Sequence, residues 1–104
     1  MKTVYEYDLY YPVTSASGRH SAAVFERLKE RLTEFFGGLT DFHHRSDGAW
    51  KFGGVTYHDE VVLLRVLGQD QAKARAFLTE LKHDLEASLN EEQILIIERE
   101  VHSL

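Results

Sequence analysis

Residues 38–60, GLTDFHHRSDGAWKFGGVTYHDE, decide the fold because they predict the β-hairpin at the centre of the chain. The stretch contains three of the six histidines and the single tryptophan. Two turn signals lie within it, 46–48 (SDG) and 51–54 (KFGG). The hairpin is therefore both the central topological element and the place where side chains able to bind a ligand gather.

The segments on either side of the hairpin alternate between the helical and the extended period. Residues 3–11 alternate and are rich in β-formers until Pro12, which predicts a strand. Helical spacing of apolar residues follows at 21–37, with Ser21 as the N-cap, and again at 70–90, with Asp70 as the N-cap. The apolar run at 61–67 and the segment 93–101 predict the last two strands.

The order β-α-β-β-α-β limits the topology. Right-handed crossovers place both helices on one face of a four-stranded antiparallel sheet in the order 4-1-3-2. We therefore predict an α+β fold of the ferredoxin-like type, in one domain covering residues 1–104.

Composition excludes several classes of function. The net charge of −5, with 12 basic and 17 acidic residues, argues against nucleic-acid binding, which needs clustered Lys and Arg. There is no cysteine, so a thiolate metal site and a cysteine nucleophile are excluded. The beginning of the chain lacks the apolar run of a signal peptide, and no segment reaches transmembrane length. We expect a cytoplasmic protein that does not bind membranes.

One face of the predicted sheet has no helix over it, although both sides of strand 61–67 are apolar. Such a face predicts self-association, with a homodimer as the first expectation, by pairing of faces or by extension of the sheet at an edge. The alternative is that a loop or the C-terminal tail covers the face. Glu6, Asp8 and Arg65 are predicted to share this face, where they would set the register of an interface, or where Arg65 would anchor an anionic ligand.

The pairing of the hairpin decides which of its side chains meet. We prefer a register with a one-residue bulge at 47–48, which places Phe42 opposite Val62 and His44 opposite Glu60. His58 then lies diagonally from His44, on the same face.

His44, His58 and Glu60 are the candidate catalytic residues. Two imidazoles and a carboxylate at this spacing suit acid–base chemistry, or a site for Zn²⁺ or Fe²⁺. The alternative is that they are solvated side chains at the end of a hairpin. Without a metal-binding motif, we expect no metal and no other cofactor.

Trp50, Tyr57 and Arg65 are the candidate ligand-binding residues. The two aromatic side chains beside a Gly-Gly turn could form a wall for a small molecule, or pack across the hairpin as a local core.

A set of short matches suggests a family. Gly38-Leu39-Thr40, Gly48-Ala49-Trp50, Gly54, Glu60 and Glu92-Gln93-Ile94-Leu95 resemble the pattern of an uncharacterised bacterial domain-of-unknown-function family. The resemblance implies a ferredoxin-like domain in which Trp50 and Glu60 are positions that the family also uses. It implies no activity.

The sequence therefore predicts a small, self-associating binding or structural module, with an unidentified small ligand near residues 43–60. The alternative is a small acid–base enzyme or a metal-binding protein that uses His44, His58 and Glu60, and we lean away from an enzyme.

Overall fold

The computed structural model describes residues 1–15, 18–45, 50–52, 55–57, 60–91 and 93–104. For residues 15, 43–45, 50–52 and 55–57 it describes the backbone alone. In chain order the elements are β1 Lys2–Pro12, β2 Thr14–Ser15, β3 Gly18–Arg19, α1 Ala22–Phe36, β4 Thr40–Arg45, β5 Trp50–Phe52, β6 Val55–Tyr57, β7 Val61–Gly68, α2 Gln71–Leu89 and β8 Leu95–Ser103.

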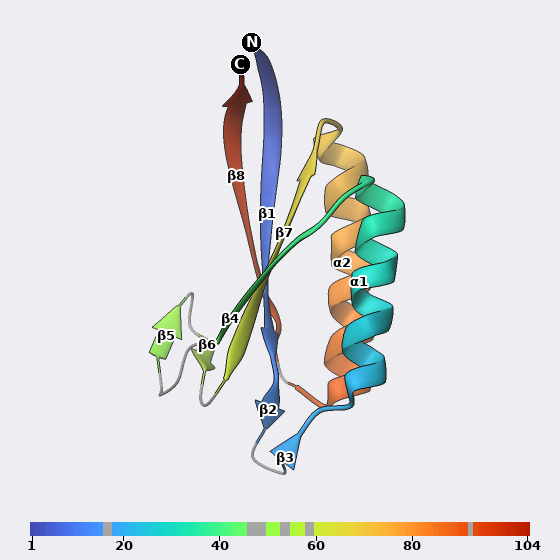
Figure 1. Ribbon diagram of the computed structural model, residues 1–104, viewed down its shortest axis with the longest axis vertical. Coiled ribbons are helices and arrows are strands. Elements are labelled where there is room, and N and C mark those ends of the chain that lie inside the picture. Colours follow the sequence, from blue (N-terminus) through green and yellow to red (C-terminus); the bar gives the residue numbers. More distant parts are fainter. Residues whose placement is uncertain (16–17, 46–49, 53–54, 58–59, 92) are drawn as a thin grey trace.

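The main sheet has four antiparallel strands in the order β4-β7-β1-β8. Figure 1 shows α1 and α2 side by side on one side of this sheet. The prediction of an α+β fold with two helices and a four-stranded antiparallel sheet is therefore confirmed. Two short pairs form sheets of their own: β2–β3 was not predicted, whereas β5–β6 belongs to the stretch predicted as a hairpin but is separate from the main sheet. Because β2, β3, β5 and β6 are also numbered, the order β4-β7-β1-β8 of the main sheet does not read as the predicted 4-1-3-2.

The predicted helix caps are confirmed. The Ser21 hydroxyl accepts a hydrogen bond from the Ala23 backbone N–H at 3.1 Å, and the Asp70 carboxylate accepts one from Lys73 N–H at 3.1 Å. Gly37, with φ 81°, and Asn90, with φ 53°, end the two helices in the left-handed conformation. Asparagine tolerates this conformation better than most residues with a side chain, which is why Asn90 can end α2.

The core lies between the helices and one face of the sheet. Its buried members come from both helices and from the central strands: Tyr7, Leu9, Tyr11, Leu28, Leu32, Val62, Leu64, Val66, Ala74, Leu78, Leu81, Leu85, Leu89 and Ile94. Phe35 is one of the apolar residues at helical spacing within 21–37, but it is 44% exposed. It stacks on Phe77 of α2 at a centroid distance of 4.1 Å, at the outer end of the core.

The preferred hairpin register is wrong. Asp41 lies opposite Leu64, and Arg45 lies opposite Val62, so the register shifts between 41 and 45. The bulge predicted at 47–48 lies outside the described residues. Phe42 consequently lies on the sheet face without helices, where its ring packs against the Arg65 guanidinium at 4.9 Å. His44 precedes Arg45 on β4 and therefore does not lie opposite Glu60.

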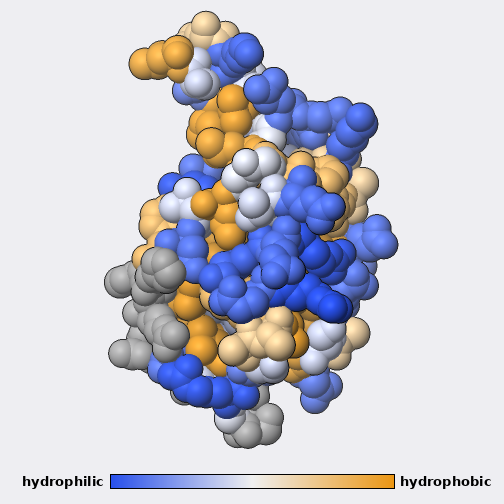
Figure 2. All heavy atoms as spheres, turned by 45° about the vertical axis from the view of Figure 1, so that its right-hand side comes forward, coloured by the Kyte–Doolittle hydropathy of each residue, from blue (hydrophilic) through white to orange (hydrophobic). Residues whose placement is uncertain are grey.

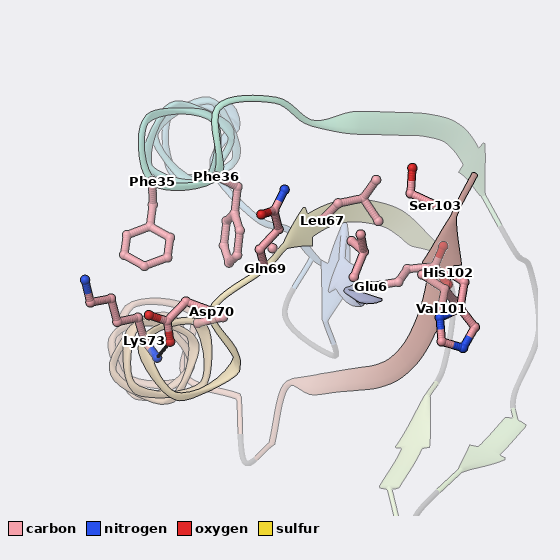
Figure 3. A pocket seen from close by; sticks show the side chains of 13 residues that line it. Glu6, Phe35, Phe36, Leu67, Gln69, Asp70, Lys73, Val101, His102 and Ser103 are labelled. Atoms are coloured by element: carbon pink, nitrogen blue, oxygen red, sulfur yellow. Dashed lines mark hydrogen bonds between the residues drawn. The ribbon is translucent and has the colours of Figure 1, made fainter. Parts of the chain in front are cut away.

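The face without helices is partly covered within one chain. Figures 1 and 3 both show the β5–β6 pair on that side of the sheet. Val61 and Leu95 are 4% and 9% exposed, and they form a second small cluster with Tyr10 and Ile97. The expectation of a bare apolar face therefore does not hold for this half of the sheet.

The strands of the sheet differ in length at its other end. β7 ends at Gly68, opposite Tyr5, whereas β1 and β8 remain paired as far as Lys2 and Ser103. The two strands therefore project beyond the helices, as the upper end of Figure 1 shows. We call β1 residues 2–4 and β8 residues 101–103 the arm.

Candidate functional site

The arm borders a cavity. This cavity has a volume of about 840 Å³ and lies where β7 stops. Its walls come from the arm, the end of β7, the end of α1 and the start of α2: Val4, Glu6, Phe35, Phe36, Leu67, Gly68, Gln69, Asp70, Lys73, Ala74, Val101, His102 and Ser103. The volume is within the range of sites that bind small molecules or peptide segments.

One wall of this cavity is aromatic, and the other comes from the arm. In Figure 3 the rings of Phe35 and Phe36 extend from α1 towards α2 on one side, and Val101 and His102 stand on the other. Leu67 lies between them and is 52% exposed, which makes it one of the most exposed large hydrophobic residues of the described chain. Figure 2 shows hydrophobic atoms at the base and at the tip of the narrow upper end. Exposed apolar side chains beside a cavity are typical of an interaction site.

The upper end also carries an incomplete strand edge. From Tyr5 to Tyr10, β1 is paired with β8 on one side and with β7 on the other. From Lys2 to Val4, nearer the N-terminus, no described strand pairs with β1 on the side of β7. Backbone groups at an open edge offer hydrogen bonds to an added strand. We call this open edge, together with the cavity beside it, the notch.

A group of four charged side chains lies next to the notch, on the face without helices. The Arg65 guanidinium donates to both carboxylate oxygens of Asp8, Nε to Oδ1 at 2.8 Å and Nη2 to Oδ2 at 3.1 Å. Arg99 Nη1 lies 2.6 Å from Asp8 Oδ2. Glu6 pairs with both arginines, at 2.9 Å from Arg65 and 3.5 Å from Arg99. Two carboxylates and two guanidiniums leave this group without net charge.

The sequence placed Glu6, Asp8 and Arg65 on one face, and the structure confirms it. It did not predict that Asp8 is buried, with a side chain 2% exposed. Burial alone raises the pKa of the Asp8 carboxyl, but the hydrogen bonds from Arg65 and Arg99 outweigh it and hold that pKa below its usual range. An anionic ligand at Arg65 would have to compete with these two carboxylates.

A second polar group, which the sequence did not predict, joins α2 to β8. Glu98 accepts a hydrogen bond from the Tyr7 hydroxyl at 2.9 Å and two from Arg75, at 2.9 and 2.6 Å. Burial, and then the hydrogen bond to Glu98, raise the pKa of Tyr7 to about 12. Tyr7 and Glu98 lie opposite each other on β1 and β8, and only this register, which the sequence did not predict, brings them together.

The predicted catalytic residues are only partly described. Glu60 precedes β7, and its side chain lies 3.5 Å from Arg19. Its backbone N–H donates to Thr14 Oγ1 at 3.4 Å. His44 is described through its backbone in β4, and His58 lies outside the described residues. Their convergence therefore stays a prediction.

The predicted ligand-binding residues are described to different extents. Trp50 and Tyr57 lie opposite each other in the β5–β6 pair, so they are cross-strand neighbours, and their side chains lie outside the description. Arg65 is the candidate whose side-chain contacts are described, and these contacts are with Asp8 and Glu6 of the neutral group above. Among the described side chains, no group of three or more His, Asp or Glu is placed to hold a metal ion.

None of the helices in the described part of the chain is long and apolar enough to cross a membrane. The resemblance to a domain-of-unknown-function family stays a hypothesis. Comparison with protein-family models, with curated proteins and with solved structures finds no match for this chain.

Proposed function

We propose that this chain is a ferredoxin-like module that forms a homodimer through the notch. The sheet order supports the fold assignment. If β1, β4, β7 and β8 are numbered among themselves from 1 to 4, the order from β8 across to β4 reads 4, 1, 3, 2. That order, with two helices on one face, is the ferredoxin-like arrangement.

The observation that carries the dimer proposal is the coincidence of an open strand edge with exposed apolar side chains. Phe35 and Leu67 are 44% and 52% exposed, and both line the cavity beside the unpaired part of β1. An edge of this kind favours pairing with another chain, and native proteins otherwise cover or charge it. A second copy of the chain satisfies both the backbone groups and the apolar surface.

Pairing through the face without helices is less well supported than pairing through the notch. Its lower half is buried within one chain, as the low exposure of Val61 and Leu95 indicates. Its centre is the neutral group around Asp8, whose charges are already compensated. Its exposed large hydrophobic residues in the described chain are Phe42, at 40%, which packs against Arg65, and Leu67, at 52%, which lies opposite Glu6 where this face meets the notch.

Light scattering after size-exclusion chromatography, across the micromolar range, tests the proposal. We expect a dimer for the wild type, a monomer for Leu67→Glu, and a dimer for Phe42→Glu. Both variants change an exposed hydrophobic residue to the same acid, so Phe42→Glu is the matched control. A wild-type monomer at every concentration would overturn the proposal. Dissociation by Phe42→Glu but not by Leu67→Glu would instead assign the dimer to the sheet face.

A further inference from the structure

We infer that two inward-pointing carboxylates, Asp41 on β4 and Glu98 on β8, close the outer edges of the main sheet to a further strand. Each carboxylate is held by a cation from one of the two helices. The inference goes beyond the proposed dimer, because it concerns the strand edges that the dimer does not use. Its consequence is that, among the described edges of the main sheet, the notch remains open to an added strand.

The strands at the two ends of the main sheet are each paired on one side only. In the order β4-β7-β1-β8, β4 pairs with β7 and β8 pairs with β1, and no other described strand belongs to this sheet. β8 is nine residues long and begins with the apolar run Leu95-Ile96-Ile97. An open edge with such a run favours pairing with another chain unless the protein blocks it.

On β8 the inward-pointing charge is Glu98. It lies opposite Tyr7, a member of the core, and therefore faces the helices. Arg75 of α2 donates to both of its oxygens, Nε to Oε1 at 2.9 Å and Nη2 to Oε2 at 2.6 Å. These hydrogen bonds hold the pKa of Glu98 below its usual range, so the carboxylate is charged at neutral pH. A strand added beside β8 would have to remove water from this ion pair, which is unfavourable.

The same arrangement recurs on β4. Asp41 lies opposite the core residue Leu64, so it also faces the helices, and its side chain is 11% exposed. Lys29 of α1 donates from Nζ to Asp41 Oδ2 at 3.5 Å. Inward-pointing charges are one of the features by which native proteins block strand edges. Their presence on both end strands, each with a cation from a different helix, argues that they serve this purpose here.

The open part of β1 has no such charge on the side that faces the helices. Side chains alternate along a strand, so Thr3 faces the same side as Tyr7 of the core, whereas Lys2 and Val4 face the other side. An uncharged residue at the helix-facing position does not oppose an added strand. The notch is therefore an open edge without an inward-pointing charge.

Replacing the complete ion pair on β8 with leucines tests the inference. Tyr7→Phe serves as the parent protein, because the Tyr7 hydroxyl would otherwise lose its acceptor. Replacing both members of an ion pair with hydrophobic residues is often neutral for stability, whereas removing one leaves the other charge without its partner. By light scattering at one concentration, we expect the parent with both Arg75→Leu and Glu98→Leu to reach about twice the mass of the parent. The parent with Arg75→Leu alone keeps the Glu98 charge at the edge and should keep the parent's mass, although it is the less stable protein.

Two comparisons exclude other causes of association. If partial unfolding caused it, the single variant would associate more than the double variant, and urea unfolding gives the stability of both. If added leucine surface caused it, replacing both Arg31 and Asp84 with leucine would have the same effect, since these two form an ion pair at 3.3 Å that joins α1 to α2. Either result overturns the inference, and so does a double variant with the parent's mass.

Hydrogen exchange shows where the association occurs. The N–H groups of β8 that point away from β1 have no partner among the described strands, and pairing at this edge would protect them. We therefore expect slower exchange within residues 95–103 of the double variant than in the parent. Association with unchanged exchange in these residues would place the contact elsewhere and overturn the inference.

Adding Leu67→Glu to each protein separates this inference from the proposed dimer. The proposed dimer predicts that Leu67→Glu dissociates the wild type, whereas the inference predicts that it leaves the association of the double variant at β8 intact. If Leu67→Glu does not dissociate the wild type, the dimer through the notch fails, and the comparison of the leucine variants still decides whether β8 is blocked. If the double variant keeps the parent's mass, the inference fails and the proposed dimer stands.

Discussion

Asp8 is bound by Arg65 through two hydrogen bonds, Nε to Oδ1 at 2.8 Å and Nη2 to Oδ2 at 3.1 Å, on the sheet face that no helix covers. The Asp8 side chain is buried although the Arg65 side chain remains 33% exposed. The side chains of Arg65 and Arg99 thus shield Asp8 from solvent and also neutralise its charge. This explains how a charged side chain is buried on the sheet face that no helix covers.

We predict that Asp8→Asn destabilises the fold by about 2–3 kcal/mol. The change removes the charged partner of Arg65 and Arg99, and breaking a buried pair costs about 3–5 kcal/mol when the remaining charge stays buried. The cost is lower here because both guanidiniums keep contact with water. Urea unfolding at pH 7 measures the change. The exposed Glu100→Gln on β8 is the control, and an equal loss in both variants would contradict a special role for Asp8.

The same pair predicts how stability depends on acidity. Because the pKa of Asp8 is lower in the fold than its ordinary value of 3.8, its contribution to stability is fully present above that value. The contribution is lost as the pH falls below about 4 and through the pKa of the folded protein. Unfolding curves from pH 7 to pH 2 should therefore show a steeper acid loss for the wild type than for Asp8→Asn. Parallel curves would be the contrary result.

Two buried tyrosines should respond in opposite directions to removal of the hydroxyl. The Tyr11 hydroxyl is buried and has no hydrogen-bond partner among the residues that the structure describes, so Tyr11→Phe should stabilise the fold by about 1 kcal/mol. The Tyr7 hydroxyl donates to the Glu98 carboxylate at 2.9 Å, so Tyr7→Phe should destabilise it by about 1–2 kcal/mol. The two variants are matched controls for each other in one series of urea unfolding curves. Loss of stability in both would mean that Tyr11 has a partner.

The alkaline side of the stability curve should report the same two phenols. Burial raises the pKa of Tyr11 to about 12, and burial with the hydrogen bond to Glu98 raises that of Tyr7 to about 12. Each raised pKa means that stability is complete below the unfolded value of 10.0 and is lost as the pH rises from there to about 12. Tyrosine absorbance should show two phenols titrating near 12 in the folded wild type. One of them should disappear in each Tyr→Phe variant, and an unchanged titration would contradict the assignment.

The sequence alone was sufficient for the helices, because their signals are local. Ser21 and Asp70 cap α1 and α2, as the spacing of polar and apolar residues predicted, and Asn90 ends α2 in the left-handed conformation. The alternation along β1 also placed Glu6 and Asp8 on one face, since the period of a strand is set by the backbone itself.

The candidate sites depended on relations that no local pattern contains. Asp41 lies opposite Leu64, one residue away from the predicted pairing, and this places Phe42 on the other face, because every side chain of a strand reverses its direction when the register shifts by one residue. The burial of Asp8 required two arginines from β7 and β8, which only the assembled sheet brings together. The notch exists because β7 ends at Gly68 while β1 and β8 continue. The sequence determined which residues form the two helices and the strands of the main sheet, and which way a regular strand faces. The tertiary structure decided where neighbouring strands end, and therefore where backbone and apolar surface remain open to a second chain.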